Sequence, residues 1–273
     1  RCAIGDAELE PLELLAEEAG LPQWDLPEEL RRRYGGGLGF ELPRTIANFV
    51  QTIDGVVAIP ALARSNALIA AESAADRFVM GLLRACADVV VVGSGTLRAS
   101  PRGTWRADRA YPPAAEGFAE LRRRRGLPEQ PAVAIVTAGG SFDPAHPVLE
   151  RGAIVLTTAA AAARIAAAVP SATEVVAVSE GATVDVAAAL AVLRGRGHRL
   201  VLSEGGPALL SSLLAAGCLD ELFLTVSPLL AGRGEGRRLA LVEGLELLPD
   251  LRVEGALRSV RRSGSHLFLR YAL

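Results

Sequence analysis

From about residue 45 onward, short apolar runs alternate with amphipathic stretches along the chain. A buried strand is typically a short run of Val, Ile, Leu and Ala, whereas a surface helix places apolar residues three and four positions apart. We therefore predict strands at 45–52, 88–92, 132–136, 153–157, 174–178, 198–202 and 221–226. Between them we predict helices at 76–87, 160–168, 184–194 and 207–216. This alternation indicates an α/β fold with a mostly parallel sheet.

The C-terminal part of the chain has a different pattern. Residues 252–261 and 266–272 predict an antiparallel hairpin, which would make the sheet mixed. Residues 100–131 show no clear period, and we expect a loop and a polar helix there.

The first 40 residues also differ from the rest, and we expect them to form an N-terminal extension to a main domain at 41–273. Leu9, Leu12, Leu15 and Ala16 share one helical face with glutamates around it, so we predict a helix there. The glycines of 35–39 predict a flexible joint between this extension and the domain.

Composition narrows the class of protein. Half of the residues are hydrophobic, the formal net charge is −2, and every one of the 29 basic residues is an arginine. A near-neutral balance gives no general attraction to nucleic acid or to an anionic membrane surface. With no visible signal peptide or membrane span, we expect a cytoplasmic protein. The scattered cysteines and histidines have no metal-ligand spacing, so we expect no metal site.

Two glycine-bearing segments follow predicted buried strands. Gly93-Ser-Gly-Thr96 comes after the strand at 88–92, and Glu204-Gly-Gly-Pro207 comes after the strand at 198–202. Ligands of such sheets bind beyond the carboxyl ends of the strands, where glycines let backbone amides approach a phosphate. Each segment alone is also compatible with a plain structural turn, and Glu204 is equally compatible with a helix cap and a ligand contact.

The two segments belong to an ordered set of motifs that resembles the pyrimidine reductases of riboflavin biosynthesis, which have a dihydrofolate-reductase-like fold. The set extends from about Arg44 to the C-terminus and consists of residues 48–55 (NFVQTIDG), 82–88 (LLRACAD), 93–96 (GSGT), 204–207 (EGGP), 219–222 (LDEL) and 227–232 (SPLLAG). The resemblance implies a three-layer α/β/α reductase domain. The chain lacks His-x-Glu and Pro-Cys-x-x-Cys elements, so we expect the deaminase half of the bifunctional relatives to be absent.

The resemblance also implies a cofactor, NADPH, and a set of site residues. The residues that would bind NADPH are Val50, Thr52, Gly93, Gly95, Thr96, Gly205, Gly206, Pro207, Ala208 and Leu209. Arg84 and Glu204 match positions that bind the substrate, a phosphoribosylamino-pyrimidine, and an arginine suits its phosphate. An arginine near the cofactor's 2′-phosphate is expected as well. The candidate catalytic carboxylates are Asp54, Glu204 and Asp76.

Several departures leave the substrate open. Ser100 stands where the family has a carboxylate, Thr52 replaces a serine, and the family's tryptophan after the first turn is missing. Asp76 offers an alternative, because dihydrofolate reductases use an acid on the corresponding helix to bind and protonate a pterin. As a helix cap, Asp76 would have no such role. Three hypotheses follow: a pyrimidine reductase, a reductase of dihydrofolate or another small carbonyl or imine, and a nucleotide-binding domain without catalysis.

The last expectation from the sequence is a homodimer. The predicted strands at 221–226 and 266–272 are dense in β-formers, and an open apolar edge invites pairing with another chain. The alternative is that residues 1–40 fold over that edge and keep the chain monomeric.

Overall fold

Ten strands form one sheet in the computed structural model, which describes residues 9–62 and 65–273. The strands are β1 (Glu13–Glu17), β2 (Arg44–Gln51), β3 (Val89–Gly93), β4 (Ala132–Val136), β5 (Ile154–Thr158), β6 (Glu174–Ser179), β7 (Leu200–Ser203), β8 (Glu221–Val226), β9 (Ala256–Ser263) and β10 (His266–Ala272). Their order across the sheet is β1-β9-β10-β8-β2-β7-β3-β4-β5-β6.

The sheet is parallel from β8 to β6 and antiparallel from β8 to β1. The antiparallel part contains the predicted C-terminal hairpin, β9 and β10. A mostly parallel mixed sheet is thus confirmed, and each strand expected between residues 45 and 226 forms within a few residues of its predicted bounds.

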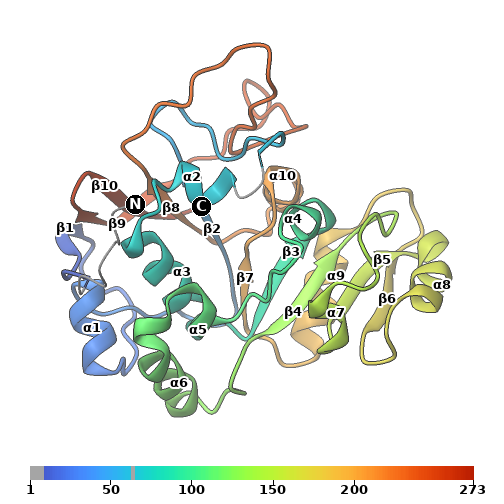
Figure 1. The fold of residues 1–273 in the computed structure, drawn as a ribbon, viewed down its shortest axis with the longest axis horizontal. Coiled ribbons are helices and arrows are strands. Elements are labelled where there is room, and N and C mark those ends of the chain that lie inside the picture. Colours follow the sequence, from blue (N-terminus) through green and yellow to red (C-terminus); the bar gives the residue numbers. More distant parts are fainter. Residues whose placement is uncertain (1–8, 63–64) are drawn as a thin grey trace, which may run out of the picture.

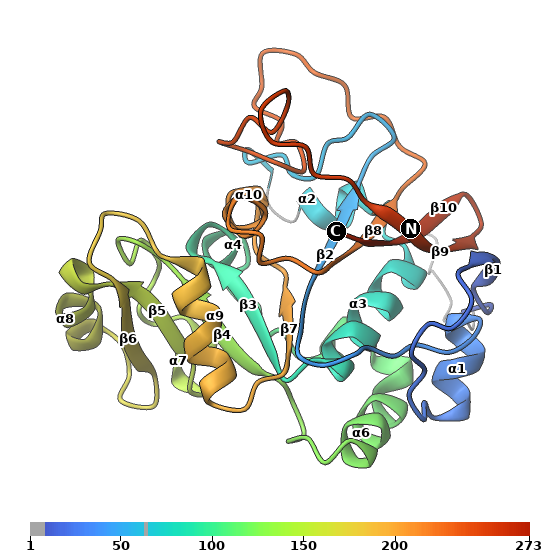
Figure 2. The ribbon, with the colours of Figure 1, turned by 180° about the vertical axis from the view of Figure 1, so that it is seen from behind.

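Helices cover both faces of the sheet and complete the three expected layers. They are α1 (Glu28–Tyr34), α2 (Ser65–Ile69), α3 (Ala74–Cys86), α4 (Ser94–Ala99), α5 (Ala107–Ala110), α6 (Ala115–Arg124), α7 (Pro147–Glu150), α8 (Ala159–Ala168), α9 (Val186–Gly195), α10 (Pro207–Ala215) and the 3-10 helix η1 (Pro112–Ala114). Helices α1, α3 and α6 pack on one face (Figure 1), and α9 and α10 pack on the other, seen from behind in Figure 2.

Helix α3 shows how the sequence builds one of these layers. Its apolar stripe, which includes Phe78 and Leu82, is fully buried against the sheet. The Ser73 side chain caps the first turn by accepting a hydrogen bond from the Asp76 amide at 3.2 Å. At the other end, the buried Arg122 guanidinium donates to the Ala87 carbonyl oxygen at 2.6 Å. Both ends of the helix are therefore fixed, and so are the side chains that it carries toward the sheet.

The N-terminal segment departs from its prediction. Residues 13–17 form strand β1, antiparallel to β9, instead of a helix, and Leu15 is exposed. Hydrogen-bond donors and acceptors along the open edge of β9 stabilise an extended partner, and this long-range pairing overrides a local helical pattern. Leu12 and, further along, Leu30 and Tyr34 are buried in the same core as α3. The segment is thus packed into the main body of the fold.

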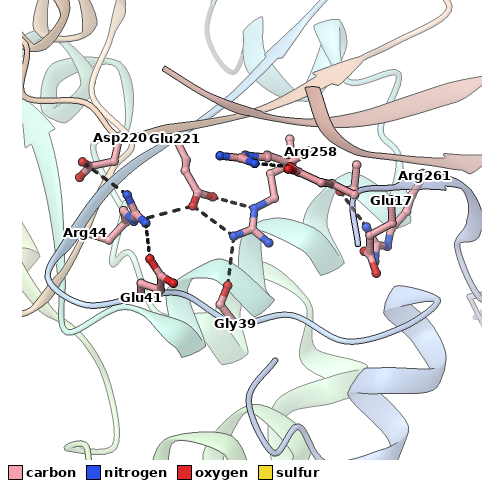
Figure 3. Close-up of polar contacts among 11 residues, drawn as sticks. Glu17, Gly39, Glu41, Arg44, Asp220, Glu221, Arg258 and Arg261 are labelled. Atoms are coloured by element: carbon pink, nitrogen blue, oxygen red, sulfur yellow. Dashed lines mark hydrogen bonds and ion pairs between the residues drawn. The ribbon is translucent and has the colours of Figure 1, made fainter. Parts of the chain in front are cut away.

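Ion pairs hold this segment to the C-terminal hairpin, as Figure 3 shows. Arg261 of β9 is almost fully buried; it donates to the Tyr34 carbonyl oxygen at 2.9 Å and to Glu17 of β1 at 2.6 Å. Arg270 of β10 pairs with the buried Glu221 at 2.6 Å and donates to the Gly39 carbonyl oxygen at 3.0 Å.

The strands that were expected to leave an open edge are interior strands. Strand β8 lies between β10 and β2, and β10 lies between β9 and β8. The premise that they offer a dimer edge is therefore wrong, because β10 covers β8, β9 covers β10, and β1 of the N-terminal segment in turn covers β9. The homodimer itself stays a prediction.

Candidate active site

The candidate site lies where β2, β3, β7 and β8 end. These strands are neighbours in the order β8-β2-β7-β3 and run parallel, so their carboxyl ends meet at one edge of the sheet. Strand β7 ends at Ser203, and the next amide, that of Glu204, still donates to the Val91 carbonyl oxygen of β3 at 2.9 Å. Glu204 is thereby fixed beside β3 before the chain turns through Gly205 and Gly206.

Arg84 and Glu204, both predicted to bind substrate, contact each other. The Arg84 Nε and Nη2 atoms donate to the two Glu204 carboxylate oxygens at 2.9 and 2.6 Å, and both side chains are close to nine-tenths buried. Arg84 Nη1 donates to the Arg106 carbonyl oxygen at 3.2 Å. Three of its five N–H donors are therefore engaged within the protein, which leaves two for a ligand.

Asp76 is buried next to this pair and does not cap its helix. Ser73 is the N-cap residue of α3, while the Asp76 carboxyl hydrogen-bonds with the Thr225 side chain of β8. Burial is the largest effect on this carboxyl and raises its pKa from 3.8 to about 6; the negative charge of Glu204 raises it further, while Thr225 and the positive charges of His266 and Arg77 lower it. A carboxyl that titrates close to neutral pH suits proton transfer.

The turn after Glu204 consists of glycines, which let a ligand approach the backbone closely. A side chain at Gly205 would collide with Leu209, so this position accepts only glycine. Gly206 is the N-cap residue of α10, Pro207 occupies the first turn, and no side chain of the described residues caps that end. The Leu209 amide already donates to the Gly206 carbonyl oxygen at 3.0 Å, so the Ala208 amide and the positive end of the helix are what this turn offers to an anion.

The Gly93–Thr96 segment lies beside that turn. A Cβ atom placed on Gly206 would be 3.5 Å from Thr96 Oγ1, so the two segments are in contact. No described atom lies within 4 Å of the position of a Cβ atom on Gly93, so this turn is open, and a Cβ atom on Gly95 would meet only the Arg98 side chain. The structure thus brings the two predicted glycine segments together.

Two serines at the strand ends were missed by the sequence analysis. The hydroxyl oxygens of Ser203 and Ser227 are buried and have no hydrogen-bond partner among the described residues. Buried polar atoms without a partner are rare, and each calls for a ligand or a water. Ser203 directly precedes Glu204, and Ser227 follows β8 and is bonded through its amide to the Gln51 carbonyl oxygen. These hydroxyls, the open glycine turns and the uncapped end of α10 fit a bound dinucleotide.

Val50, Thr52 and Asp54 lie at the end of β2, and their contacts are internal. The Thr52 hydroxyl donates to Asp54 at 2.5 Å and accepts from the Val56 amide, and the Asp54 carboxylate accepts from the Ala231 and Gly232 amides at 3.0 and 2.8 Å. These bonds, the Thr52 one first, lower the pKa of Asp54 to about 2. These bonds make Asp54 a brace between two loops, and its catalytic role stays a prediction.

The described residues contain no group of three or more His, Cys, Asp or Glu side chains placed to hold a metal ion. Within the same residues, no helix is both long enough and apolar enough to cross a bilayer. Cys86 is buried in the core, and burial raises the pKa of its thiol to about 12.

Known proteins have a similar fold. Residues 43–267 match the family model of the RibD C-terminal domain. The fold is similar to that of a pyrimidine reductase-like protein from Corynebacterium diphtheriae, with a TM-score of 0.63 and 20% identity over 91% of this chain and 96% of that one. RibD from Acinetobacter baumannii matches with a TM-score of 0.63 and 18% identity over 89% of this chain.

A third similar structure is a diaminohydroxyphosphoribosylaminopyrimidine deaminase/5-amino-6-(5-phosphoribosylamino)uracil reductase from Thermotoga maritima, with a TM-score of 0.62 and 21% identity over 85% of this chain. The chain spans 59% of the Acinetobacter protein and 56% of the Thermotoga protein. No protein with a curated description matches the sequence. The family match covers most of the residues, including both glycine segments, Arg84 and Glu204, and the chain belongs to the RibD C-terminal domain family.

Proposed function

We propose that this protein is an NADPH-dependent reductase that acts on 5-amino-6-(5-phosphoribosylamino)uracil. Its family and the reductases with a similar fold support the assignment of this chain as an oxidoreductase of riboflavin biosynthesis. The observation that carries the proposal is the buried Arg84–Glu204 pair beside the uncapped start of α10. In this proposal the pair binds the substrate and the neighbouring turn binds the phosphates of the cofactor, because hydride transfer requires both molecules to be held side by side.

In this proposal the dinucleotide lies along the carboxyl edge of the sheet. Its pyrophosphate would contact the amides near Gly206 and Ala208, and Thr96 would contact it from the neighbouring turn. Its nicotinamide would then extend toward the ends of β7 and β8, where the buried hydroxyls of Ser203 and Ser227 have no hydrogen-bond partner among the described residues. When bound, the nicotinamide supplies the hydride.

The residues of the protein would position the substrate and bind its charged phosphate. The hydride adds to C1 of the opened ribosyl imine and a proton adds to the imine nitrogen, which gives a ribitylamino pyrimidine. Arg84 would hold the substrate phosphate through its two remaining N–H donors, and Glu204 keeps the guanidinium in place. Because both groups are buried, their orientation is set before the substrate arrives.

A second candidate function is the reduction of dihydrofolate or another small imine, and Asp76 is the observation that favours it. Its carboxyl is buried, bonded to Thr225 and close enough to neutral pKa to donate a proton. Since Ser73 is the N-cap residue of α3, helix capping does not explain why an acidic residue is buried at position 76. A buried carboxyl of this kind suits recognition and protonation of a pterin ring.

A side-by-side assay of NADPH oxidation with the phosphoribosylamino-pyrimidine and with dihydrofolate tests both candidates. Under the first, the pyrimidine is turned over and Asp76→Asn retains most of the activity. Under the second, dihydrofolate is turned over, and Asp76→Asn abolishes this near neutral pH. Asp185→Asn, at the cap of α9 away from the site, is the matched control and should change neither rate. NADPH binding without turnover of either substrate would refute the pyrimidine and the dihydrofolate reactions and favour a non-catalytic nucleotide-binding domain.

A further inference from the structure

The last turn of α3, which carries Arg84, ends inside the protein. The carbonyl oxygens of the last four residues of a helix have no partner within the helix, and in α3 these belong to Leu83, Arg84, Ala85 and Cys86. The chain leaves the helix at Ala87 in an extended conformation, and the Ala87 amide donates to the Leu83 and Arg84 carbonyl oxygens at 3.0 and 3.3 Å. Ala85 and Cys86 are fully buried, so their carbonyl groups need donors from elsewhere in the protein.

An arginine in the last turn of α6, Arg122, supplies most of these donors. Its Nη1 atom donates to the Arg84 and Ala85 carbonyl oxygens at 3.2 Å each. The same atom donates to the Ala87 carbonyl oxygen at 2.6 Å, and the Nε atom donates to the Pro128 carbonyl oxygen at 2.6 Å. Arg122 therefore connects the backbone of residue 84 to the segment that leads into β4.

Arg122 is a charged group in the interior of the protein. The residue is 1% exposed, its four hydrogen bonds all end on backbone carbonyl oxygens, and its Nη2 atom has no partner among the described residues. Burial lowers the pKa of the guanidinium to about 10, so it stays charged at neutral pH. A buried charge is costly, and an apolar side chain of similar size often stabilises a fold as well or better. We therefore expect Arg122 to matter for the position of the residues that it contacts.

We propose that Arg122 is a positioning residue that acts through Arg84 and determines how tightly the protein binds the phosphate of its substrate. The inference rests on the proposed function, in which Arg84 binds that phosphate. Glu204 and the Arg106 carbonyl oxygen hold the guanidinium of Arg84, and Arg122 holds its backbone. Paired hydrogen bonds to a phosphate depend on the direction of the guanidinium, and a misplacement of about 1 Å costs about 100-fold. Both ends of the Arg84 side chain therefore need support.

The test measures the affinity for ribose 5-phosphate by calorimetry, together with KM and kcat for the phosphoribosylamino-pyrimidine. Arg122→Met keeps most of the side-chain volume and removes the donors. It should weaken binding of ribose 5-phosphate and raise KM by roughly 10- to 100-fold, while kcat and the Kd for NADPH stay within about twofold of the parent. Arg122→Lys keeps the charge without the planar fork of donors, so its affinity should lie between those of the parent and of Arg122→Met.

Arg125→Met is the matched control, because Arg125 caps the same end of α3 at a different residue. Its guanidinium donates to the Cys86 carbonyl oxygen and lies 3.8 Å from the centre of the Trp24 ring. This variant should also lose stability in urea unfolding, since a buried carbonyl group loses its donor. Its affinity for ribose 5-phosphate should nevertheless stay within about twofold of the parent's.

The outcomes separate this inference from the proposed function. A parent protein that does not bind ribose 5-phosphate would overturn the phosphate-binding role of Arg84, and the inference with it. If the parent binds, equal losses of affinity in Arg122→Met and Arg125→Met would show that capping of α3 alone matters, and an unchanged affinity in Arg122→Met would show that Arg84 needs no such support. Either result overturns the inference alone. Should Arg122→Met fail to fold, Arg122→Lys gives the same comparison, and an affinity equal to the parent's overturns the inference.

Discussion

Replacing Asp76 with asparagine should stabilise the protein at pH 8 and leave its stability almost unchanged at pH 4. Asparagine has nearly the same size and can keep a hydrogen bond with Thr225, so the change removes the ionisable group with little loss of packing. In the folded protein the pKa of Asp76 is about 6, mainly because the side chain is buried and only 5% exposed.

The size and the sign of this change in the free energy of unfolding follow from the pKa of Asp76. Because the folded pKa lies above the ordinary value of 3.8, the folded state binds more protons than the unfolded state between these values. The free energy of unfolding therefore falls as the pH rises from about 4 to about 6, and stays reduced above that range. At about 1.36 kcal/mol for each pKa unit, the ionised carboxyl costs the folded state about 3 kcal/mol. Asp76→Asn should recover up to this amount.

Urea unfolding at pH 4, 5, 6, 7 and 8 measures the effect for parent and variant. The difference in unfolding free energy should be near zero at pH 4 and should grow to about 3 kcal/mol at pH 8, with a rise of roughly 2–4 °C in melting temperature for each kcal/mol. Asp185→Asn, at an exposed cap, should show no such dependence on pH. A difference that is constant across this range, or a variant less stable than the parent at pH 8, would refute the argument from burial.

Three further predictions concern stability and assembly. Arg84→Ala should lower the free energy of unfolding by about 3–5 kcal/mol, because the buried Glu204 carboxylate loses its partner, and a urea midpoint equal to the parent's would contradict this. Arg261→Met removes the ion pair between the buried Arg261 and the partly exposed Glu17, and it should cost several times more unfolding free energy than Arg262→Met. The change at the half-exposed Arg262 should cost at most about 1 kcal/mol, and equal losses in urea unfolding would show that burial is irrelevant here. The homodimer predicts a mass near twice 28.5 kDa in light scattering at micromolar concentration, through a surface other than β8 and β10, and a mass near 28.5 kDa would rule it out.

The order of the strands and of the longer helices from β2 to β10 could be predicted from the sequence because its signals are local. A run such as Val89–Val92 is apolar at every position only if both of its faces are buried, and the glycines that follow mark the end of the strand. The same holds for Leu200–Ser203 before Glu204. The ordered motifs then indicated which strand ends carry the site, and the structure brings those ends together.

The N-terminal segment and the electrostatics of the site depended on contacts between distant parts of the chain. Leu12 and Leu15 have a helical spacing, but the strand β1 forms because β9, more than two hundred residues away, offers it an unpaired edge. Arg84 and Glu204 are 120 positions apart, and nothing in either local sequence shows that they neutralise each other. The raised pKa of Asp76 likewise depends on burial against β8 and on its distance from Glu204 and His266. Hydrophobic periodicity is a property of neighbouring residues, whereas edge pairing and desolvation arise only when the sheet has assembled. The sequence by itself therefore determined the elements from β2 onward, and the tertiary structure decided which elements pair and how the buried side chains are charged.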